Sequence, residues 1–261
     1  ASADDAIRRI MIDREFGAAG DRILVEEFLR GRETSFIVIT DGRRALPLAT
    51  AMDHKAVFDG DEGPNTGGMG AVSPSPFVGP ELHEEVLRTI IRPTIERMAD
   101  EGRPYRGALY AGLMLTEDGP KVLEYNGRFG DPETQPQMLR LESDLAEVLA
   151  SAADGDAPEK LAWSEHPSAC VILASGGYPG HYEKGKEISG WEEAARLPGI
   201  ALFHAGTKSE GGRLVTSGGR VLGVCASEAA LPATLGAVYG AIGTIKFEGM
   251  HFRRDIGTAR M

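Results

Sequence analysis

The chain has 261 residues and a formal net charge of −11, with 42% hydrophobic and 26% charged residues. Length and composition predict one large or two ordinary globular domains with ample apolar side chains for a core. The acidic balance argues against nucleic acid or an anionic membrane as a partner, although it leaves room for local basic pockets that bind a small phosphorylated ligand.

The first part of the chain predicts a helix, several strands and a long loop. Residues 3–13 place apolar side chains at helical spacing, and residues 22–29 and 34–42 have the character of strands separated by a turn. "RALPLAT" predicts another short strand. Residues 53–79 are rich in Gly, Pro, Ser and Asp and predict a loop, which at this length is usually functional or disordered.

Residues 80–100 return to a helical pattern, with Pro80 suited to the first turn and Pro93 expected to kink the helix. "GALYAGLML", "TEDGP" and "KVLEYN" then predict an antiparallel hairpin with Asp118-Gly119 at its tip. Two helical runs follow, before a break in composition.

That break, "DGDAPEKLAWSEHP", separates two predicted domains, residues 1–160 and 161–261. The helical runs before it cover residues 132–141 and 143–153. Beyond it, "SACVILAS", "IALFHAGT", "GGRLVTSG" and "RVLGVCAS" predict strands, and residues 228–243 predict a helix.

Two further features concern the cellular compartment. No apolar stretch approaches the roughly 18 residues of a membrane helix, and the first residues lack a signal-peptide pattern. Cys170 and Cys225 show no metal-ligand spacing and are expected to be buried free thiols rather than a disulfide. We therefore expect a cytoplasmic protein without a membrane partner.

The run "EYNGRFGDPETQ" (124–135) concentrates charge where a strand should enter a core. Alternation along a strand places Glu124 and Asn126, and by extension Arg128, on one face. Carboxylate and amide oxygens suit Mg²⁺ held jointly with nucleotide phosphates, and a neighbouring arginine suits a phosphoryl oxygen. The residues alone leave open a surface ion pair between Glu124 and Arg128.

Three other segments allow two interpretations each. "GPNTGGMGA" (63–71) exposes backbone N–H groups that suit an anion, but it lacks the lysine of a P-loop, and a flexible connector is favoured. "DHK" (53–55) is interpreted as a solvated turn and Glu26-Glu27 as a solvent-facing edge, with ligand contacts as the alternatives. No catalytic triad or H-E-x-x-H motif is present, and His204 is expected to be a packed or capping residue.

From "RFGDPETQ" outward, the sequence closely resembles the phosphoribosylamine–glycine ligase, or glycinamide ribonucleotide synthetase, family. "EEFLRGRETSF", "DHK", "GPNTGGMGA", "YAGLML", "ASGGYPG", "FHAGTK" and "TSGGRVLGV" extend the resemblance along almost the whole chain. It implies an ATP-grasp ligase of purine biosynthesis that joins glycine to 5-phosphoribosylamine through a glycyl phosphate, with ATP and Mg²⁺ or Mn²⁺ as cofactors. The implied fold is α+β, with the second half of an ATP-grasp core followed by a smaller mixed α/β C-terminal domain.

The resemblance assigns roles to individual residues around the phosphates. Glu124 and Asn126 match the family's metal ligands, and Arg128 would stabilise charge on the transferred group. "YAGLML" offers only apolar residues where many relatives place a further acid, so we expect fewer protein ligands and more water at the metal. Asp131 is expected to approach the substrate sugar.

The remaining assignments concern the nucleotide and the sugar phosphate. Glu26 is expected near the exocyclic amine of adenine, the Leu29 backbone at the ring edge and Glu33 at the ribose hydroxyls. By analogy with related enzymes, Lys208 and Arg220 would hold the 5-phosphate of the substrate.

The departure from the family pattern lies at the front of the chain. No N-terminal nucleotide-fold domain and no glycine loop with a lysine precede "EEFL", so we expect the chain alone to be inactive. Two alternatives stay open, a non-catalytic nucleotide- or partner-binding fragment and a carboxylate–amine ligase for another acid. The intact "EYNGRFGDPE" argues against the first and "RFGDPETQ" with "GPNTGGMGA" against the second, and a monomer is favoured.

Overall fold

The computed structural model describes residues 2–258, which form two compact units, one ending at Gly31 and the other beginning at Arg32. In the first unit, helix α1 (Ala3–Ile7) continues into a π-helical turn, η1 (Arg8–Ile12), which confirms the predicted helix. No helix in the described part of the chain is long and apolar enough to span a membrane.

The strand predicted for residues 22–29 is wrong. After the 3-10 helix η2 (Gly17–Asp21), residues 22–30 form neither helix nor strand. Leu24, Val25 and Phe28 are 78–83% exposed. A strand needs a neighbour for its backbone hydrogen bonds, and no described strand pairs with this segment, so its apolar composition alone does not produce one.

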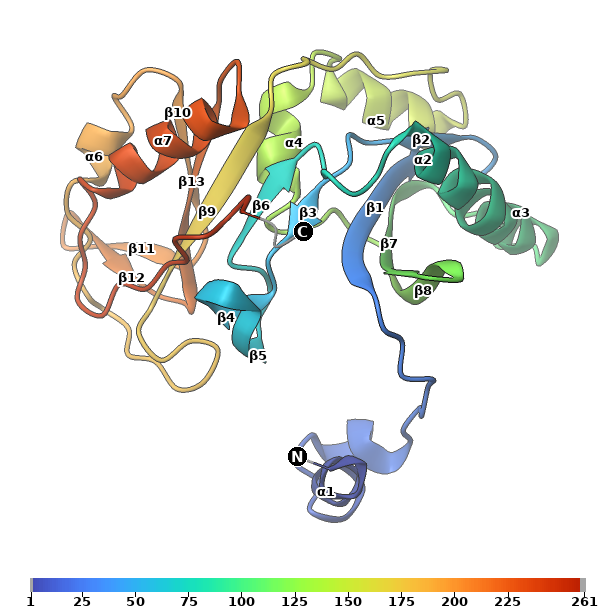
Figure 1. The fold of residues 1–261 in the computed structure, drawn as a ribbon, viewed down its shortest axis with the longest axis horizontal. Helices are drawn as coiled ribbons and strands as arrows, with labels where there is room; N and C mark the ends of the chain where they lie inside the picture. The colour runs from blue at the N-terminus through green and yellow to red at the C-terminus, as the bar shows by residue number, and fades with distance from the viewer. Residues whose placement is uncertain (1, 259–261) are drawn as a thin grey trace. The chain divides into compact units, whose positions relative to one another are not determined.

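The second unit contains a four-stranded antiparallel sheet in the order β2-β1-β7-β8 (Figure 1). Its strands are β1 (Arg32–Thr40), β2 (Ala45–Pro47), β7 (Gly107–Thr116) and β8 (Gly119–Asn126). The predicted hairpin of β7 and β8 is confirmed. Phe36 and Val38 of β1 pack against the helix of residues 80–100, and Ile37 and Ile39 pack against α5 (Leu145–Asp154). Both faces of β1 are therefore buried.

The helix predicted for residues 80–100 is confirmed, with an irregularity before Pro93. It consists of α2 (Pro80–Val86), a π-helical turn η4 (Leu87–Ile91) and α3 (Arg92–Asp100). Proline lacks a backbone N–H and crowds the preceding turn. The wider π-helical turn accommodates this residue, as such turns do within longer helices.

A five-stranded antiparallel sheet has the order β10-β13-β9-β6-β3. Its strands are β3 (Met52–Asp53), β6 (Gly70–Ser73), β9 (Ser168–Ala174), β10 (Ile200–His204) and β13 (Arg220–Ser227). Helix α7 (Leu231–Ile242) packs on one face, and α4 (Thr134–Arg140) lies against β9 and β13 near Cys170 and Cys225. These cysteines lie opposite each other and are free and buried, as predicted.

The long loop predicted for residues 53–79 is partly wrong, because the segment contains short strands. Besides β3 and β6 it forms the hairpin of β4 (Ala56–Phe58) and β5 (Glu62–Asn65), joined by η3 (Asp59–Asp61). β6 pairs with β9, which follows about 100 residues later in the sequence. A partner so distant leaves no local periodicity in the sequence.

Pairing of β6 with β9 also bears on domain organisation. One sheet takes strands from both sides of residue 160, and residues 32–258 belong to one compact unit. The smaller C-terminal elements are α6 (Trp191–Ala194) and the hairpin of β11 (Thr207–Glu210) and β12 (Arg213–Thr216). The division into residues 1–160 and 161–261 stays a prediction.

The segment after α7 is fastened to the hairpin of β4 and β5. Arg253 is 1% exposed and donates to both oxygens of Asp255, to Asp61 and to the carbonyl of Ala56. Beside this ion pair lies a hollow of about 380 Å³. Its lining residues are Phe58, Asp59, Met250, His251, Phe252 and Arg254.

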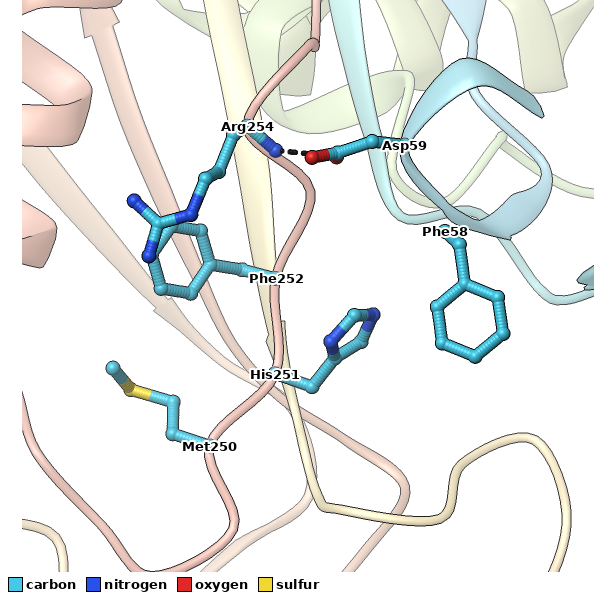
Figure 2. A pocket seen from close by; sticks show the side chains of 6 residues that line it. All are labelled: Phe58, Asp59, Met250, His251, Phe252 and Arg254. Carbon is cyan, nitrogen blue, oxygen red and sulfur yellow. Dashed lines mark hydrogen bonds between the residues drawn. The ribbon is translucent and has the colours of Figure 1, made fainter. Parts of the chain in front are cut away.

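The polar groups of this hollow already have partners in the protein. The Arg254 amide donates to Asp59, as the dashed line in Figure 2 marks. His251 Nε2 donates to the carbonyl of Val57, and the Arg254 guanidinium lies 4.9 Å from the centre of the Phe252 ring. The groups that line this hollow therefore serve to hold the C-terminal segment against the hairpin of β4 and β5.

We expect Asp255 to make the second unit sensitive to acid. Burial would raise the pKa of Asp255, but hydrogen bonds from Arg253 and the Gly60 amide outweigh burial and lower this pKa to about 2. A lowered pKa stabilises the fold above the unfolded value, and this contribution is lost as the pH falls from about 4 to about 2. Urea unfolding across this range should lose about 2 kcal/mol through Asp255.

The control is a carboxylate on the exposed side of α3. Asp255→Asn should flatten the decline in unfolding free energy between about pH 4 and pH 2, whereas the exposed Glu96→Gln should leave it as it is. An unchanged decline in Asp255→Asn would refute the assignment.

Candidate active site

Glu124 and Asn126 lie on one face of β8, as alternation predicts. Asn126 Nδ2 donates to Glu124 Oε1 at 3.0 Å, which leaves Glu124 Oε2 and Asn126 Oδ1 as two neighbouring acceptors. Opposite Glu124 lies Gly112, where a Cβ atom would be 3.2 Å from Glu124 Cγ. The small residue on β7 therefore gives the carboxylate its room.

These two residues fit a divalent cation that takes most of its ligands from elsewhere. No group of three or more His, Cys, Asp or Glu residues in the described part of the chain could hold a metal ion. Mg²⁺ is commonly bound through one or two carboxylates together with phosphates and water. A carboxylate and an amide oxygen side by side meet that requirement.

Arg128 lies beside this face without forming the ion pair that the sequence left open. Its Nη1 donates to the carbonyl of Phe129, and its guanidinium lies 5.8 Å from the centre of the Tyr110 ring. Among the described ion pairs there is none between Arg128 and Glu124.

Glu133, which the sequence analysis did not assign, is the buried acid of this region. It is 2% exposed and accepts hydrogen bonds from Ser35 Oγ at 2.6 Å and Tyr110 Oη at 2.9 Å. Burial, followed by the charge of Glu133, raises the pKa of Tyr110, so the phenol stays protonated and donates. The network ties the segment after Arg128 to β1 and β7.

The interpretation of "DHK" as a solvated turn is wrong. His54 is 6% exposed, and burial, with the nearby Arg253 charge, lowers its pKa to about 4. Burial would lower the pKa of Lys55, but the ion pair between Lys55 Nζ and Glu33 Oε2, at 2.6 Å, outweighs it and the pKa is raised. Both side chains are thus part of the folded interior or its margin.

Asp53 completes a group of charges around these residues. Its carboxyl oxygen Oδ1 is buried and has no hydrogen-bond partner among the described residues. Burial and the neighbouring Glu133 charge hold the pKa of Asp53 well above its usual range, against the opposing effect of Lys55 and Arg220. A Cβ atom at Gly68 would lie 2.7 Å from this oxygen, so only glycine fits there.

The glycine-rich segment 63–71 is held in place rather than forming the flexible connector that was favoured. The amides of residues 66–69 all donate to protein acceptors, namely Lys55 O, Tyr178 Oη, Thr66 Oγ1 and His54 O, at 2.8–3.0 Å. Because these donors are already used, the segment in this conformation is also not an open phosphate cradle. Its partners are distant in sequence, so composition could not reveal them.

Arg220 joins the glycine-rich segment to the "RFGDPETQ" run. Its Nη1 donates to the carbonyls of Gly67 and Asp131, at 2.6 and 2.7 Å, and its Nη2 donates to Asp131 Oδ2 at 2.9 Å. Gln135 Nε2 donates to the other carboxylate oxygen of Asp131 at 2.8 Å. Lys208, by contrast, is paired with Glu210 on its own strand.

The residues expected at the nucleotide are divided between the two units. Glu26 and Leu29 lie in the first unit, within the segment that forms neither helix nor strand. Glu33 lies in the second unit, at the exposed start of β1, and is paired with Lys55.

Two family models match the chain. One, for the phosphoribosylglycinamide synthetase ATP-grasp (A) domain, matches residues 1–134, and the other, for the C domain of the same synthetase, matches residues 168–259. The chain belongs to the phosphoribosylglycinamide synthetase family.

Curated relatives agree with this family. The chain is 49% identical over 257 residues to the phosphoribosylamine–glycine ligase of Vibrio vulnificus and 51% identical over 258 residues to that of Pseudomonas aeruginosa. Each alignment covers 98% of this chain and 60% of the relative. The chain thus spans 60% of the length of these two relatives.

Solved structures confirm the predicted ATP-grasp fold with a C-terminal domain. Phosphoribosylamine–glycine ligase from Thermotoga maritima superposes with a TM-score of 0.80 at 35% identity, over 88% of this chain and 57% of that one. The biotin carboxylase domain of the Hydrogenobacter thermophilus 2-oxoglutarate carboxylase superposes with a TM-score of 0.67 at 15% identity, over 95% of this chain and 53% of that one. The second likeness is one of fold alone.

The sequence contained a partial signal for the residues that were missed. Glu133 stands in the run that was recognised, but its burial depends on Ser35 and Tyr110, which lie 98 and 23 residues away. Tyr178 stands in "ASGGYPG", a segment of the family resemblance with no assigned role. In both cases the motif identified a relevant segment but not the contact.

We expect Tyr110→Phe to destabilise the second unit by about 1–3 kcal/mol, because the buried Glu133 carboxylate loses a hydrogen-bond donor. Urea unfolding measures this loss. Tyr125→Phe is the matched control, since its hydroxyl contacts Thr94 Oγ1 at an exposed site and should cost no more than about 0.5 kcal/mol. Equal losses in the two variants would contradict the role of Tyr110.

Proposed function

We propose that this chain contributes the catalytic face of an ATP-dependent ligase that joins glycine to 5-phosphoribosylamine, giving glycinamide ribonucleotide in purine biosynthesis. The reaction would pass through a glycyl phosphate, which the sugar amine then attacks. The observation that carries the proposal is the pair of oxygens on Glu124 and Asn126 beside Arg128. The sequence around them is 49–51% identical to the two ligases compared.

Glu124 Oε2 and Asn126 Oδ1 would hold Mg²⁺ or Mn²⁺. Such a cation, when bound, neutralises charge on the nucleotide phosphates. Arg128 would direct its free N–H groups at the transferred phosphoryl group, where donors fixed in advance stabilise developing charge. Its guanidinium lies 5.8 Å from the centre of the Tyr110 ring, an attractive contact that favours this position of the side chain.

For the nucleotide we propose ATP, with Glu26 and the Leu29 backbone at the adenine and Glu33 at the ribose. The ion pair of Glu33 with Lys55 supports an anionic ligand nearby, because a ligand phosphate could engage the ammonium while a ribose hydroxyl engages the carboxylate. The Hydrogenobacter domain of similar fold was solved with MgADP. The ADP bound to that domain is consistent with ATP as the nucleotide of this chain.

For the sugar substrate we propose contacts from Asp131, Lys208 and Arg220. Arg220 uses three N–H groups on protein acceptors, which leaves Nε and one Nη2 hydrogen for a phosphate oxygen. The proposal also includes a cytoplasmic location and a monomer. The rival function is a fragment that binds nucleotide or a partner without catalysis.

A chimera distinguishes the ligase from this rival. The chain replaces its counterpart in the Pseudomonas aeruginosa ligase, and ADP release is measured with ATP, Mg²⁺, glycine and 5-phosphoribosylamine. A ligase releases ADP only when both co-substrates are present. A chimera that folds and binds ATP but whose ADP release does not depend on both co-substrates would support the rival. The same assay is also run on the chain alone, for which we expect no turnover.

In the chimera we expect Glu124→Ala to lower kcat by about 100-fold or more, the scale of losing one group that stabilises transition-state charge. The same assay at rising Mg²⁺ concentrations measures this effect. Glu96→Gln, on the exposed side of α3, is the control. Near-normal turnover of Glu124→Ala at saturating Mg²⁺ would remove Glu124 from the metal site.

Arg220→Gln should raise the KM for 5-phosphoribosylamine by about tenfold or more, as expected for a lost hydrogen bond to a charged group. The KM values for ATP and glycine should change little. Arg213→Gln, which removes an exposed partner of Glu187 on the neighbouring hairpin, is the matched control. A matching rise in the KM for ATP would instead assign Arg220 to the nucleotide.

A further inference from the structure

A hollow of about 470 Å³ lies between the "RFGDPETQ" run and the end of β10. One wall comes from residues 128–131, Thr134, Gln135 and Met138, and the other from Phe203 and His204. The hollow begins at Arg128, beside the proposed metal face, and extends to the C-terminal elements. It therefore connects the place of phosphoryl transfer with a second group of side chains.

The lining of the hollow suits a small polar ligand with an anionic end. Phe129, Met138 and Phe203 provide apolar surface, whereas Asp131 and Gln135 provide hydrogen-bonding groups. Small-molecule sites commonly combine apolar walls with a few placed polar groups. Asp131 is fixed from both sides, since Gln135 holds one carboxylate oxygen and Arg220 holds the other.

His204, the last residue of β10, provides an imidazole to the second wall of the hollow. The sequence predicted a packed or capping residue, but the residue is exposed, and its ring meets that of Trp191 edge-on at 5.7 Å between ring centres. Its Nδ1 lies 3.0 Å from Thr207 Oγ1, and its Nε2 forms no hydrogen bond within the described part of the chain. When the Thr207 hydroxyl donates to Nδ1, the neutral imidazole carries its hydrogen on Nε2.

The position of His204 brings it close to the residues proposed for the sugar phosphate. His204 pairs with Leu222 across β10 and β13, two residues along the chain from Arg220. The amide of Gly206 donates to the carbonyl of Arg220, and Lys208 follows on β11. One short stretch of backbone therefore connects the imidazole with both cationic side chains.

We propose that this hollow binds the phosphoribosyl substrate lengthwise and that His204 Nε2 is a donor to its 5-phosphate. The amine-bearing carbon then points toward Arg128 and the transferred phosphoryl group, and the ribose hydroxyls meet Asp131 and Gln135. A charged phosphate accepts strong hydrogen bonds from such donors. This inference rests on the proposed ligase function and adds to it a specificity residue.

The test uses ribose 5-phosphate, a stable relative of the substrate, titrated into the 261-residue chain by calorimetry. His204→Ala should weaken its binding by about tenfold or more, the scale of one hydrogen bond to a charged group. His204→Gln, which keeps an N–H donor, should recover part of the affinity. His166→Ala removes an exposed histidine elsewhere and should leave binding unchanged.

Two further ligands separate phosphate recognition from sugar recognition. Inorganic phosphate and ribose should each bind more weakly than ribose 5-phosphate, and only phosphate binding should depend on His204. In NMR spectra of the histidine side chains, ribose 5-phosphate should shift the His204 signals but not those of His166. Circular dichroism establishes that each variant is folded.

Three results would overturn the inference. They are no binding of ribose 5-phosphate to the unaltered chain, equal affinity in His204→Ala, or equal affinity for inorganic phosphate and ribose 5-phosphate. The outcome is separate from that of the proposed reaction. A chimera that releases ADP only with both co-substrates, together with His204-independent binding, would retain the ligase and reject this site.

Discussion

The buried carboxylate of Glu133 is the interaction on which the arrangement of the candidate active site depends. It accepts hydrogen bonds from Ser35 and Tyr110 of the four-stranded sheet, while the helix that follows it lies against the five-stranded sheet. At the end of that helix Arg140 is 8% exposed and donates to Ser73 Oγ of β6. The segment between Glu133 and Arg140 is therefore held at one end to the four-stranded sheet and at the other to the five-stranded sheet.

This restriction makes the site a product of long-range contacts rather than of one motif. Arg220 of β13 holds the carbonyl of Gly67 and both the carbonyl and carboxylate of Asp131. Tyr178, from the loop after β9, accepts from the Gly67 amide. Elements late in the sequence therefore position loops that come much earlier, so that loss of the C-terminal elements would free Gly67 and Asp131 without removing either residue.

The sequence was sufficient where the determining forces are local. The hairpin of β7 and β8 follows from alternating apolar residues, and the shared face of Glu124 and Asn126 follows from strand geometry alone. It was insufficient where strand formation depends on pairing with a distant segment. Residues 22–29 have the composition of a strand, but no described strand pairs with them. β6, in contrast, is a strand because it pairs with β9. For the same reason "DHK" suggested a solvated turn, although His54 is buried beneath a segment some 200 residues later.

Charge within the site explains how an acidic protein can suit anionic ligands. The net charge is −11, yet Lys55 and Arg220 lie near the carboxyl group of Asp53. Lys55 and Arg220 are already paired with acids of the protein, so a ligand that displaces those partners gains only when it offers groups of similar charge and geometry. A phosphate meets this condition, whereas a neutral ligand that displaced those partners would leave the two partly buried cations unpaired. The ion pairs of Lys55 and Arg220 thus stabilise the site without a ligand, and they also allow the site to discriminate between ligands.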